Sequence, residues 1–405
     1  MILCPLWLGA ASALAATFPL TLPKPSPDKG PAVYGDPLGR WVARLGSPDY
    51  EIRVRAARAI GQLGPRAEAA VPDLVAVLDD VYPTVRQEAV SALALIGPAA
   101  KAATPALLAI VENPAERARE RAVNAVGLIG PAAAVVPALT AAVKDDEREV
   151  RYQAVLALGF FRREAKAAAP ALTAALKDRD WEVRLAAAWA LAVVCPDDPA
   201  GVEFLVAGLK DKDRRVRWAA AMALKNLGPQ PRGVVPALTE ALTDPDPHVR
   251  ILVATQLAAA DPENRGAVEV VLAAAKHPAA AVRFAAIGRL NDLGLTDDVV
   301  PALTAALKDQ NPSNRLLAAE ELARAAPGSR AALAGIVAGL KERDWLVRYQ
   351  AAAALARLGP AAKGAGGPLT QALADDRDEV RRAAAQALIA VDPEAARRAG
   401  LITPD

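Results

Sequence analysis

Histidine and cysteine are almost missing from this sequence of 405 residues, which contains two of each. His248 and His277 lie far apart, and neither belongs to a Cys-x-x-Cys or His-Glu-x-x-His pattern. Because protein metal sites combine several histidine, cysteine and carboxylate ligands, we expect no metal site. A P-loop and a GxGxxG fingerprint are also missing, so the sequence indicates no cofactor.

Aromatic residues are scarce too, at 4% of the chain, although 53% of its residues are hydrophobic. Much of the apolar content is therefore alanine, a strong helix former. Charge of one sign is not in excess, since 48 basic and 46 acidic residues give a net charge of +2. This balance provides no general attraction to nucleic acid or anionic lipid. No serine or cysteine stands in a recognisable nucleophile motif, so we expect the protein not to be an enzyme.

The first residues lack charge altogether. Residues 2–16 are uncharged and largely apolar, and Ala13-Leu14-Ala15 matches the small-residue pattern of a cleavage site. We therefore expect residues 1–16 to be a secretory signal peptide, although no basic residue precedes Lys24. The protein would then be exported, to the periplasm or the extracellular space, and the alternative is a cytoplasmic protein. The apolar stretch is short for a membrane helix, so no transmembrane span is expected after the signal is removed.

The segment that follows is rich in proline. Residues 17–36, TFPLTLPKPSPDKGPAVYGD, carry five prolines and are expected to form an extended linker with little secondary structure. Cys4 precedes this linker and would leave with the signal peptide. Cys195 would then be the only cysteine, so no internal disulfide could form.

The rest of the chain is organised by an arginine that recurs every 32 or 33 residues, usually after a valine. These repeat arginines are Arg53, Arg86, Arg119, Arg151, Arg184, Arg217, Arg250, Arg283, Arg315, Arg348 and Arg381. A period sustained over most of the chain identifies a tandem repeat protein, in which neighbouring repeats stabilise one another.

One regular repeat, residues 170–196, indicates the local structure. Pro170 suits the first position of a helix, and the polar residues 178–180 form a turn in which Asp180 is placed to cap a second helix. That second helix is expected from Trp181 to Val194. Each repeat thus holds a first helix and a second helix that carries the repeat arginine. Several second helices end at Gly-Pro, where glycine suits a helix C-terminus and proline prevents continuation.

No stretch shows the sustained alternation of a β-strand. We therefore predict an all-α fold, a right-handed α-α superhelix (solenoid) of about eleven two-helix repeats of about 33 residues. The repeats are expected at residues 37–392, and residues 393–405 are expected to form a C-terminal tail.

The repeated pattern resembles that of HEAT repeats. It combines Pro-x-Leu-x-x-Ala-Leu, an acidic turn, Val-Arg, Ala-Leu and Gly-Pro in constant phase over residues 37–392. It is most similar to the short, alanine-rich bacterial subtype named after phycobilisome lyases. The ankyrin signature T-P-L-H-x-A and the tetratricopeptide pattern are missing.

The resemblance implies a role for the repeat arginines. In HEAT repeats, aspartate and arginine form a ladder of hydrogen bonds between adjacent repeats, so the eleven arginines are expected to be structural. An acidic residue lies four positions before the arginine in several repeats, among them Asp180, Asp213 and Asp246. The alternative is a basic track that binds phosphates.

Candidate partner-binding residues come from one face of the second helices. The residue after the repeat arginine and the residue four positions later share a helical face, which we call the front face. In the middle of the chain the front face is apolar, which indicates a groove for a protein or peptide. The alternative is that these side chains pack between neighbouring second helices. The candidates are Tyr152, Leu156, Leu185, Trp189, Trp218, Met222, Ile251 and Phe284.

The sequence therefore predicts a non-catalytic scaffold that binds a protein or peptide, with no specific nucleic acid as partner. Two alternatives stay open. One is an enzyme or enzyme subunit of the lyase-like kind, which would need polar side chains clustered in a pocket. The other is a nucleic-acid-binding protein, which would need positive charges aligned on one face and a steep dependence on salt.

Overall fold

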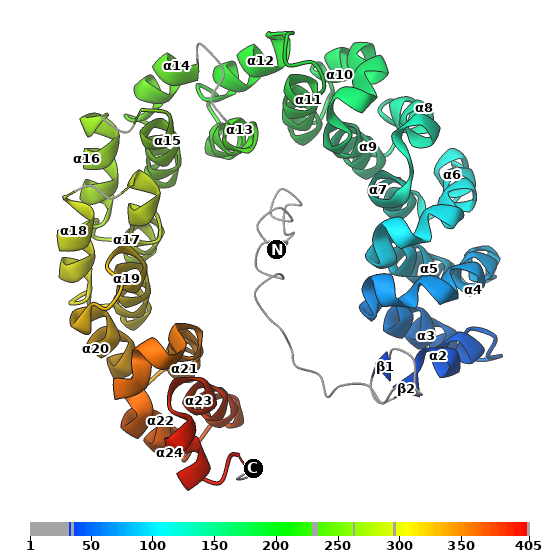
Figure 1. Ribbon diagram of the computed structural model, residues 1–405. Helices are drawn as coiled ribbons and strands as arrows, with labels where there is room; N and C mark the ends of the chain where they lie inside the picture. Colours follow the sequence, from blue (N-terminus) through cyan, green and yellow to red (C-terminus); the bar gives the residue numbers. More distant parts are fainter. Residues whose placement is uncertain (1–31, 34–35, 229–233, 262–263, 295–296, 403–405) are drawn as a thin grey trace. The chain divides into compact units, whose positions relative to one another are not determined.

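The computed structural model describes residues 32–33, 36–228, 234–261, 264–294 and 297–402. The predicted signal peptide and most of the predicted linker lie outside these residues. The chain forms two compact units, an N-terminal unit at Met1–Gly201 and a C-terminal unit at Val202–Asp405. Each unit is a stack of helix pairs (Figure 1), and the predicted all-helical repeat fold is confirmed.

The N-terminal unit has two rows of helices (Figure 1). One row consists of second helices, which lie side by side: α3 (Tyr50–Gln62), α5 (Pro83–Ile96), α7 (Arg119–Ile129), α9 (Arg148–Phe160) and α11 (Trp181–Val194). The other row consists of first helices: α2 (Leu38–Leu45), α4 (Val71–Ala76), α6 (Thr104–Glu112), α8 (Ala132–Ala142) and α10 (Ala169–Ala175). Because α11 has the predicted bounds, its turn and cap signals were sufficient to locate it.

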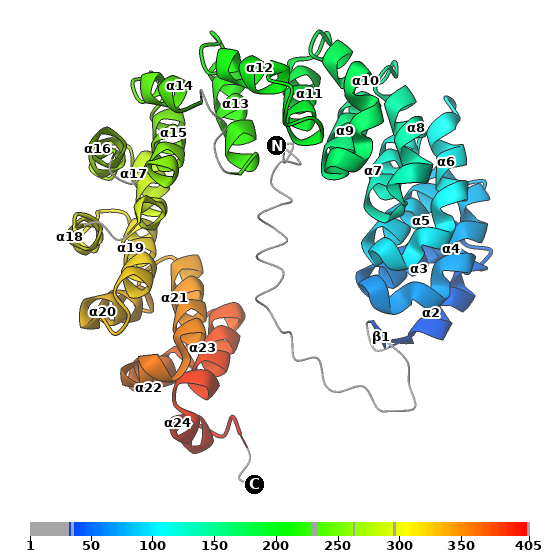
Figure 2. The same ribbon diagram turned by 45° about the horizontal axis from the view of Figure 1, so that its top comes forward.

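The C-terminal unit repeats this arrangement, as Figures 1 and 2 show from two directions. Its second helices are α13 (Arg214–Asn226), α15 (Pro247–Ala260), α17 (Ala280–Ile287), α19 (Pro312–Ala325), α21 (Trp345–Leu358) and α23 (Asp378–Val391). Its first helices are α12 (Ala200–Gly208), which begins just before the unit, α14 (Val234–Ala241), α16 (Arg265–Ala274), α18 (Val299–Ala306), α20 (Arg330–Gly339), α22 (Gly366–Ala372) and α24 (Pro393–Arg398). Helix α24 lies in the predicted tail, which is therefore partly helical.

The connections between repeats are longer than simple turns. Several contain a seven-residue 3-10 helix: η2 (Gly64–Ala70), η4 (Gly97–Ala103), η5 (Arg162–Ala168) and η7 (Gly359–Ala365). Two shorter 3-10 helices are η6 (Leu290–Leu293), which lies between two repeats, and η3 (Val77–Asp79), which lies between α4 and α5 of one repeat. Gly97 ends α5 with a φ of 71°, a conformation that glycine adopts readily. Proline in the Gly-Pro pair thus ends the α-helix but opens a 3-10 helix, which the sequence did not indicate.

A short antiparallel pair precedes the first helix. Strand β1 (Ala32–Val33) pairs with β2 (Asp36–Pro37), with Ala32 opposite Pro37. The predicted linker therefore ends in a small amount of regular structure, which its proline content did not indicate.

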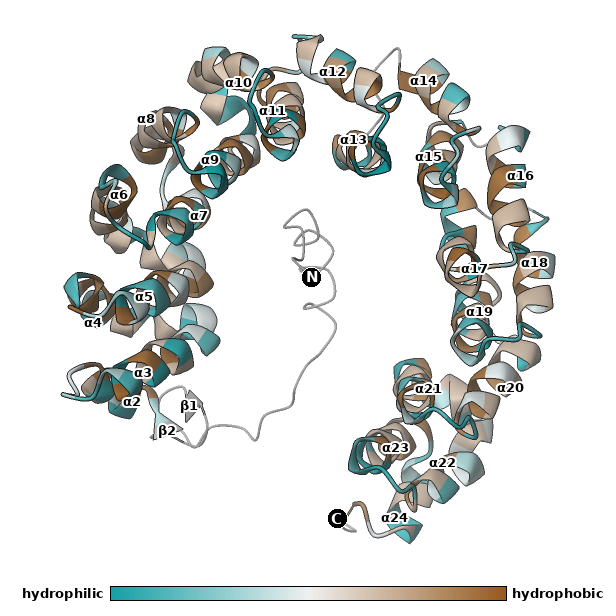
Figure 3. Cartoon of the chain, turned by 180° about the vertical axis from the view of Figure 1, so that it is seen from behind, coloured by the Kyte–Doolittle hydropathy of each residue, from teal (hydrophilic) through white to brown (hydrophobic). Residues whose placement is uncertain are grey.

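The core lies between the two rows of each unit and is built from leucine, isoleucine, valine and alanine. In the N-terminal unit, Leu93, Leu107, Leu139, Leu158 and Leu172 are fully buried. Hydrophobic segments face between the rows, whereas hydrophilic turns follow one edge of each unit (Figure 3). Since each leucine comes from a different helix, the core of a unit is continuous through its repeats, and each repeat is stabilised by its neighbours.

One segment of the described residues, Pro83–Glu112, is long and apolar enough to cross a membrane by length and composition. It consists of α5, η4 and α6 in succession, and Ala100 in η4 departs from helical geometry. Val90, Leu93 and Leu107 of this segment are fully buried. Its apolar content is therefore what packing between neighbouring repeats requires.

Alanine in place of Gly159 is expected to lower the free energy of unfolding by about 1–3 kcal/mol, because it overpacks the core. A Cβ atom at Gly159 in α9 would lie 2.3 Å from Cζ3 of Trp189 in α11. The matched control is Gly367→Ala in α22, where a Cβ would meet nothing within 4 Å. That change should raise the free energy of unfolding by about 0.4–1 kcal/mol. Urea denaturation of both variants checks the pair, and equal effects would contradict it.

Candidate functional site

Each repeat arginine lies on a second helix and reaches toward the turn before that helix. In Arg217, Nη1 donates to the carbonyl oxygens of Asp211 and Lys212, at 2.9 and 3.3 Å. Its Nε and Nη2 donate to Oδ2 and Oδ1 of Asp244 in the next repeat, at 2.7 and 3.1 Å. Asp244 is buried, and its Oδ1 also accepts from the backbone N–H of Asp246 at 2.7 Å. The arginine therefore connects the turns of two successive repeats.

The same geometry recurs in both units. We call a rung each pair in which Nε and Nη2 of the arginine donate to the two oxygens of one carboxylate. The rungs are Arg53–Asp80, Arg86–Glu116, Arg151–Asp178, Arg217–Asp244, Arg283–Asp309 and Arg348–Asp375. Less regular ion pairs join Arg119 to Asp145 and Glu147, and Arg315 to Glu342. The remaining arginines donate to carbonyl oxygens of their own turn: Arg184, Arg250 and Arg381. A guanidinium suits this position because it has five donors in a fixed plane.

The acidic residues of the rungs are not the ones that the sequence singled out. Rung carboxylates lie six positions before the next repeat arginine, or three positions in the case of Glu116. Asp213 and Asp246, four positions before, instead accept from backbone N–H groups and cap second helices. Asp180 is also at a cap position but makes no capping hydrogen bond, because it accepts from Nη2 of Arg151 at 2.6 Å.

One carboxylate position of the ladder is occupied by histidine. Where the spacing places the acid for Arg250, the chain has His277, whose Nδ1 accepts from the backbone N–H of Ala279 at 3.1 Å. Within the described residues, no hydrogen bond joins Arg250 to a carboxylate. Its Nη1 donates to the carbonyl oxygens of Asp244 and Pro245, at 2.6 and 3.1 Å. Arg250 is therefore a natural comparison for the complete rung at Arg217.

We expect the stability gained from the rungs to disappear in strong acid. Hydrogen bonds from Arg283 and Arg348 lower the pKa of Asp309 and Asp375 to about 2. A folded-state pKa below the ordinary value of 3.8 means that stability is fully present above that value and is lost as pH falls through about 2. Urea denaturation at pH values from about 5 to about 2 should show this loss. A free energy of unfolding that stays constant over that range would contradict the expectation.

Two glutamates, the half-buried Glu320 and the buried Glu321, act in the opposite direction. Burial raises the pKa of Glu320 and Glu321 above 4.5. A raised carboxyl pKa means that stability increases as pH falls through it. The stability of the chain should therefore pass through a maximum on the acid side of neutral before the rungs are lost.

The predicted groove of the front face is only partly exposed. Leu156, Leu185, Trp189 and Ile251 are buried, so they do not offer a surface to a partner. The ring of Trp189 packs where Gly159 leaves space, and Phe160 contacts it edge to face at 5.6 Å. For these four residues the prediction was wrong, because the second helices pack closely and enclose large side chains between them. Tyr152, Trp218 and Met222 are half-buried, and Phe284 is exposed.

A different set of apolar side chains is exposed in the N-terminal unit. Leu95, Leu128 and Phe160 are 60%, 50% and 64% exposed. Each lies nine positions after a repeat arginine, near the end of α5, α7 and α9. These helices are neighbours in one row (Figure 1), so the three residues form what we call the apolar row. The signal was present in the sequence, since the same position of three consecutive repeats is large and apolar.

Charged side chains lie on the same second helices. Glu88 of α5 pairs with Arg58 of α3 at 3.0 Å and with Arg121 of α7 at 3.4 Å. Arg121 lies seven positions before Leu128, which places both on one face of α7 about two turns apart. Two arginines that share one carboxylate leave a net positive charge beside the apolar row.

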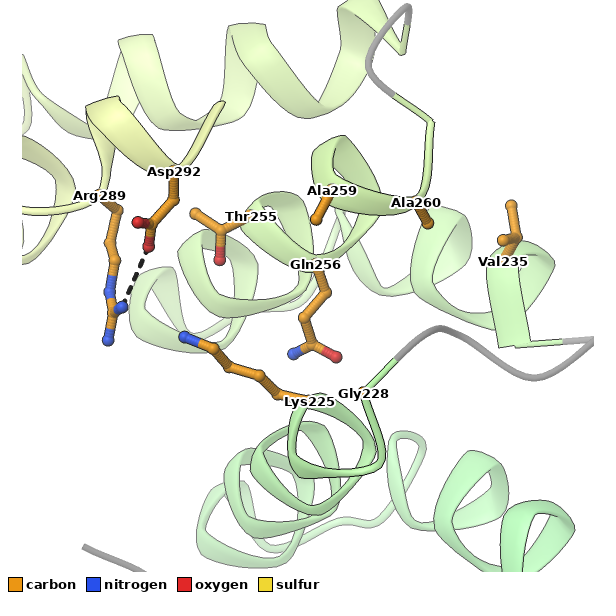
Figure 4. A pocket seen from close by; sticks show the side chains of 9 residues that line it. All are labelled: Lys225, Gly228, Val235, Thr255, Gln256, Ala259, Ala260, Arg289 and Asp292. Carbon is orange, nitrogen blue, oxygen red and sulfur yellow. Dashed lines mark hydrogen bonds and ion pairs between the residues drawn. The ribbon is translucent and has the colours of Figure 1, made fainter. Parts of the chain in front are cut away.

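The C-terminal unit contains a pocket with a volume of about 720 Å³. Its wall is formed by side chains from α13, α14, α15 and η6 and from the adjoining connections: Lys225, Gly228, Val235, Thr255, Gln256, Ala259, Ala260, Arg289 and Asp292. Figure 4 shows Lys225, Arg289, Asp292 and Thr255 toward one end of the pocket and Val235 toward the other. This pocket could not be predicted from the sequence, because its residues come from several repeats and match no motif.

Gln256 has an unused acceptor at this pocket. Its side chain is 4% exposed, and Nε2 donates to the carbonyl oxygens of Ala221 and Leu252, at 3.0 and 3.2 Å. Its Oε1 is buried and has no hydrogen-bond partner among the described residues. A buried acceptor without a partner costs about 1–3 kcal/mol. Burial and the positive charge of Arg289 also lower the pKa of Lys225.

The described residues contain no group of three or more histidine, cysteine, aspartate or glutamate side chains that could hold a metal ion. Cys195 is a free, half-buried cysteine. Within the part of the chain that the structure describes, the candidate sites are therefore the apolar row and the pocket.

Comparison with protein families identifies the repeat. A sequence model of HEAT repeats matches residues 40–127, 104–192, 169–246, 235–323 and 300–389. Among curated proteins, none matches the chain significantly.

Solved structures resemble parts of the chain. An engineered protein has 23% identity and a TM-score of 0.36, over 87% of this chain and 98% of its own. YibA of Escherichia coli has 20% identity and a TM-score of 0.43, over 69% of this chain and 98% of its own. A chain from the structure of Kap95p with RanGDP has 15% identity and a TM-score of 0.41, over 90% of this chain and 63% of its own. At these identities the likeness does not extend to function.

Proposed function

Because the chain belongs to the HEAT repeat family, we propose that it is a non-catalytic scaffold that binds another protein through the apolar row of its N-terminal unit. The observation that carries this proposal is the exposure of Leu95, Leu128 and Phe160 at one position of three consecutive repeats. Exposed apolar side chains that lie together are typical of protein interaction surfaces.

The spacing of the row suggests what binds there. Neighbouring helix axes lie about 8–10 Å apart, so the row extends over about 20 Å. A partner helix rises about 10.5 Å in seven residues and would place apolar residues at positions i, i+7 and i+14 against the row. The positive charge of Arg58 and Arg121 beside Glu88 favours acidic residues on the flank of that helix. We therefore propose an acidic amphipathic helix as the partner.

We also propose that the chain belongs to the phycobilisome-lyase-like subtype, because its repeats are short and rich in alanine. A lyase activity would need catalytic side chains, and neither the rungs nor the apolar row supplies a nucleophile or a general base outside an ion pair. Nucleic-acid binding is less favoured, because in the described residues the repeat arginines are engaged by carboxylates or carbonyl oxygens.

Site-specific crosslinking tests the proposal. The photoreactive residue p-benzoylphenylalanine would replace Leu128 in the apolar row or, as control, exposed Thr173 on the first helix α10. Irradiation in the source cells should crosslink an acidic helical protein from position 128 and not from position 173. The same crosslinked protein from both positions, or none from position 128, would refute the scaffold assignment.

A further inference from the structure

The pocket of the C-terminal unit has the features of a ligand site. We propose that it binds an acylated amino acid through its free carboxylate, as found at the C-terminal residue of a peptide. Its residues lie in the C-terminal unit, so the inference does not depend on the apolar row. Three parts of the pocket wall support the proposal: a cationic end, a buried acceptor and an apolar end (Figure 4).

The cationic end suits a carboxylate. Lys225 extends from α13 toward Arg289 and Asp292, and Arg289 pairs with Asp292 at 3.1 Å (Figure 4). Two cations and one carboxylate leave one positive charge, which a single anionic group would balance. Burial and the charge of Arg289 lower the pKa of Lys225, and an anion bound here would offset the repulsion between the two cations. A carboxylate can also accept from a lysine and an arginine together.

The acceptor suits an amide N–H. Both N–H bonds of the Gln256 Nε2 atom donate to backbone carbonyl oxygens. Its Oε1 lacks a partner among the described residues, in a side chain that is 4% exposed. A ligand N–H would satisfy this oxygen. A simple carboxylic acid or a phosphate ester has no such donor, whereas an acylated amino acid has one beside its carboxylate.

The opposite end suits an apolar side chain. Val235, Ala259 and Ala260 form it, and none of them carries a polar side-chain atom (Figure 4). An amino acid has its carboxylate, its N–H and its side chain on one carbon atom, so the three groups can reach the three parts of the wall together. Ligand sites commonly combine apolar walls with a few placed polar groups in this way.

The test uses the full chain and a fluorescein-labelled Ala-Ala-Ala-Leu peptide with a free C-terminus, followed by fluorescence anisotropy. We expect the free acid to bind, and the same peptide with a C-terminal amide to bind at least about tenfold more weakly. Lys225→Met should weaken binding of the acid by a similar factor. The matched control is Lys276→Met, at an exposed lysine of the same unit that does not line the pocket. Thermal denaturation of each variant confirms that it is folded.

A competition experiment tests whether Gln256 recognises the N–H group of the ligand. N-acetyl-leucine should displace the labelled peptide, whereas 4-methylpentanoate at the same concentration should not, because it has the same carboxylate and apolar chain but no N–H. Equal displacement by both would overturn the inference. It would also be overturned by equal affinity of acid and amide, by equal effects of the two lysine changes, or by no binding of the acid up to about 1 mM. None of these outcomes involves the apolar row, so they neither support nor contradict the scaffold proposal.

Discussion

Aspartate in place of both Leu128 and Phe160 is expected to weaken binding of the crosslinked partner by about 100-fold or more. Residues at the centre of a protein interface commonly contribute about 2 kcal/mol or more each, and two such losses exceed a factor of 100 in Kd. Both side chains are at least half exposed, so the substitutions remove little from the core. The added charges should also repel the acidic partner that we propose.

The control for this change is Val81→Asp. Val81 is 81% exposed in the same unit but lies in a turn, away from the apolar row. Its substitution should leave Kd unchanged within error. Isothermal titration with the purified partner measures both variants. A double variant that binds as tightly as the unchanged chain would show that the apolar row is not the interface.

Alanine in place of Arg217 is expected to lower the free energy of unfolding by about 1–3 kcal/mol. The substitution removes four hydrogen bonds and leaves the buried carboxylate of Asp244 without its cation. Arg250→Ala is the matched comparison, since among the described residues that side chain donates to two carbonyl oxygens and to no carboxylate. Its loss should cost about 0.5–1.5 kcal/mol. Urea denaturation at neutral pH distinguishes the two.

A reciprocal change adds a rung instead of removing one. His277→Asp supplies a carboxylate at the position where the spacing places a partner for Arg250. The new side chain can also accept from the backbone N–H of Ala279, as Nδ1 of His277 does. The free energy of unfolding should rise by about 0.5–1 kcal/mol. If Arg217→Ala and Arg250→Ala cost the same and His277→Asp adds nothing, the rungs do not stabilise the stack.

The helices could be predicted from the sequence because local signals repeat in constant phase. Proline, the acidic turn and Val-Arg predicted α11 with its observed bounds. The 3-10 helices escaped prediction because the same Gly-Pro pair can end an α-helix and open a tighter one. Arg162 shows the limit of such signals. It occupies the position where other repeats have the glycine of Gly-Pro, and its φ is 52°. Arginine has no preference for this conformation, so the sequence did not indicate it.

The candidate site was harder to predict because exposure depends on neighbouring helices. Trp189 and Leu156 share the front face with Tyr152, yet two of the three are buried and one is half-buried. Helical periodicity gives the direction of a side chain on its own helix, but it does not give the distance to the next helix. The pocket around Gln256 required contacts among several repeats, which no spacing within one repeat encodes.

The position nine residues after the repeat arginine differs in chemistry between the two units. It holds Leu95, Leu128 and Phe160 in the N-terminal unit, and Asp292, Arg324 and Arg357 in the C-terminal unit, all of them exposed. Such different chemistry is tolerated at these six residues because their side chains are exposed, whereas Val193, at the same position of the repeat between them, is buried. Substitution of Leu95, Leu128, Asp292, Arg324 and Arg357 could therefore change what the chain recognises while the buried core of the repeats stays the same.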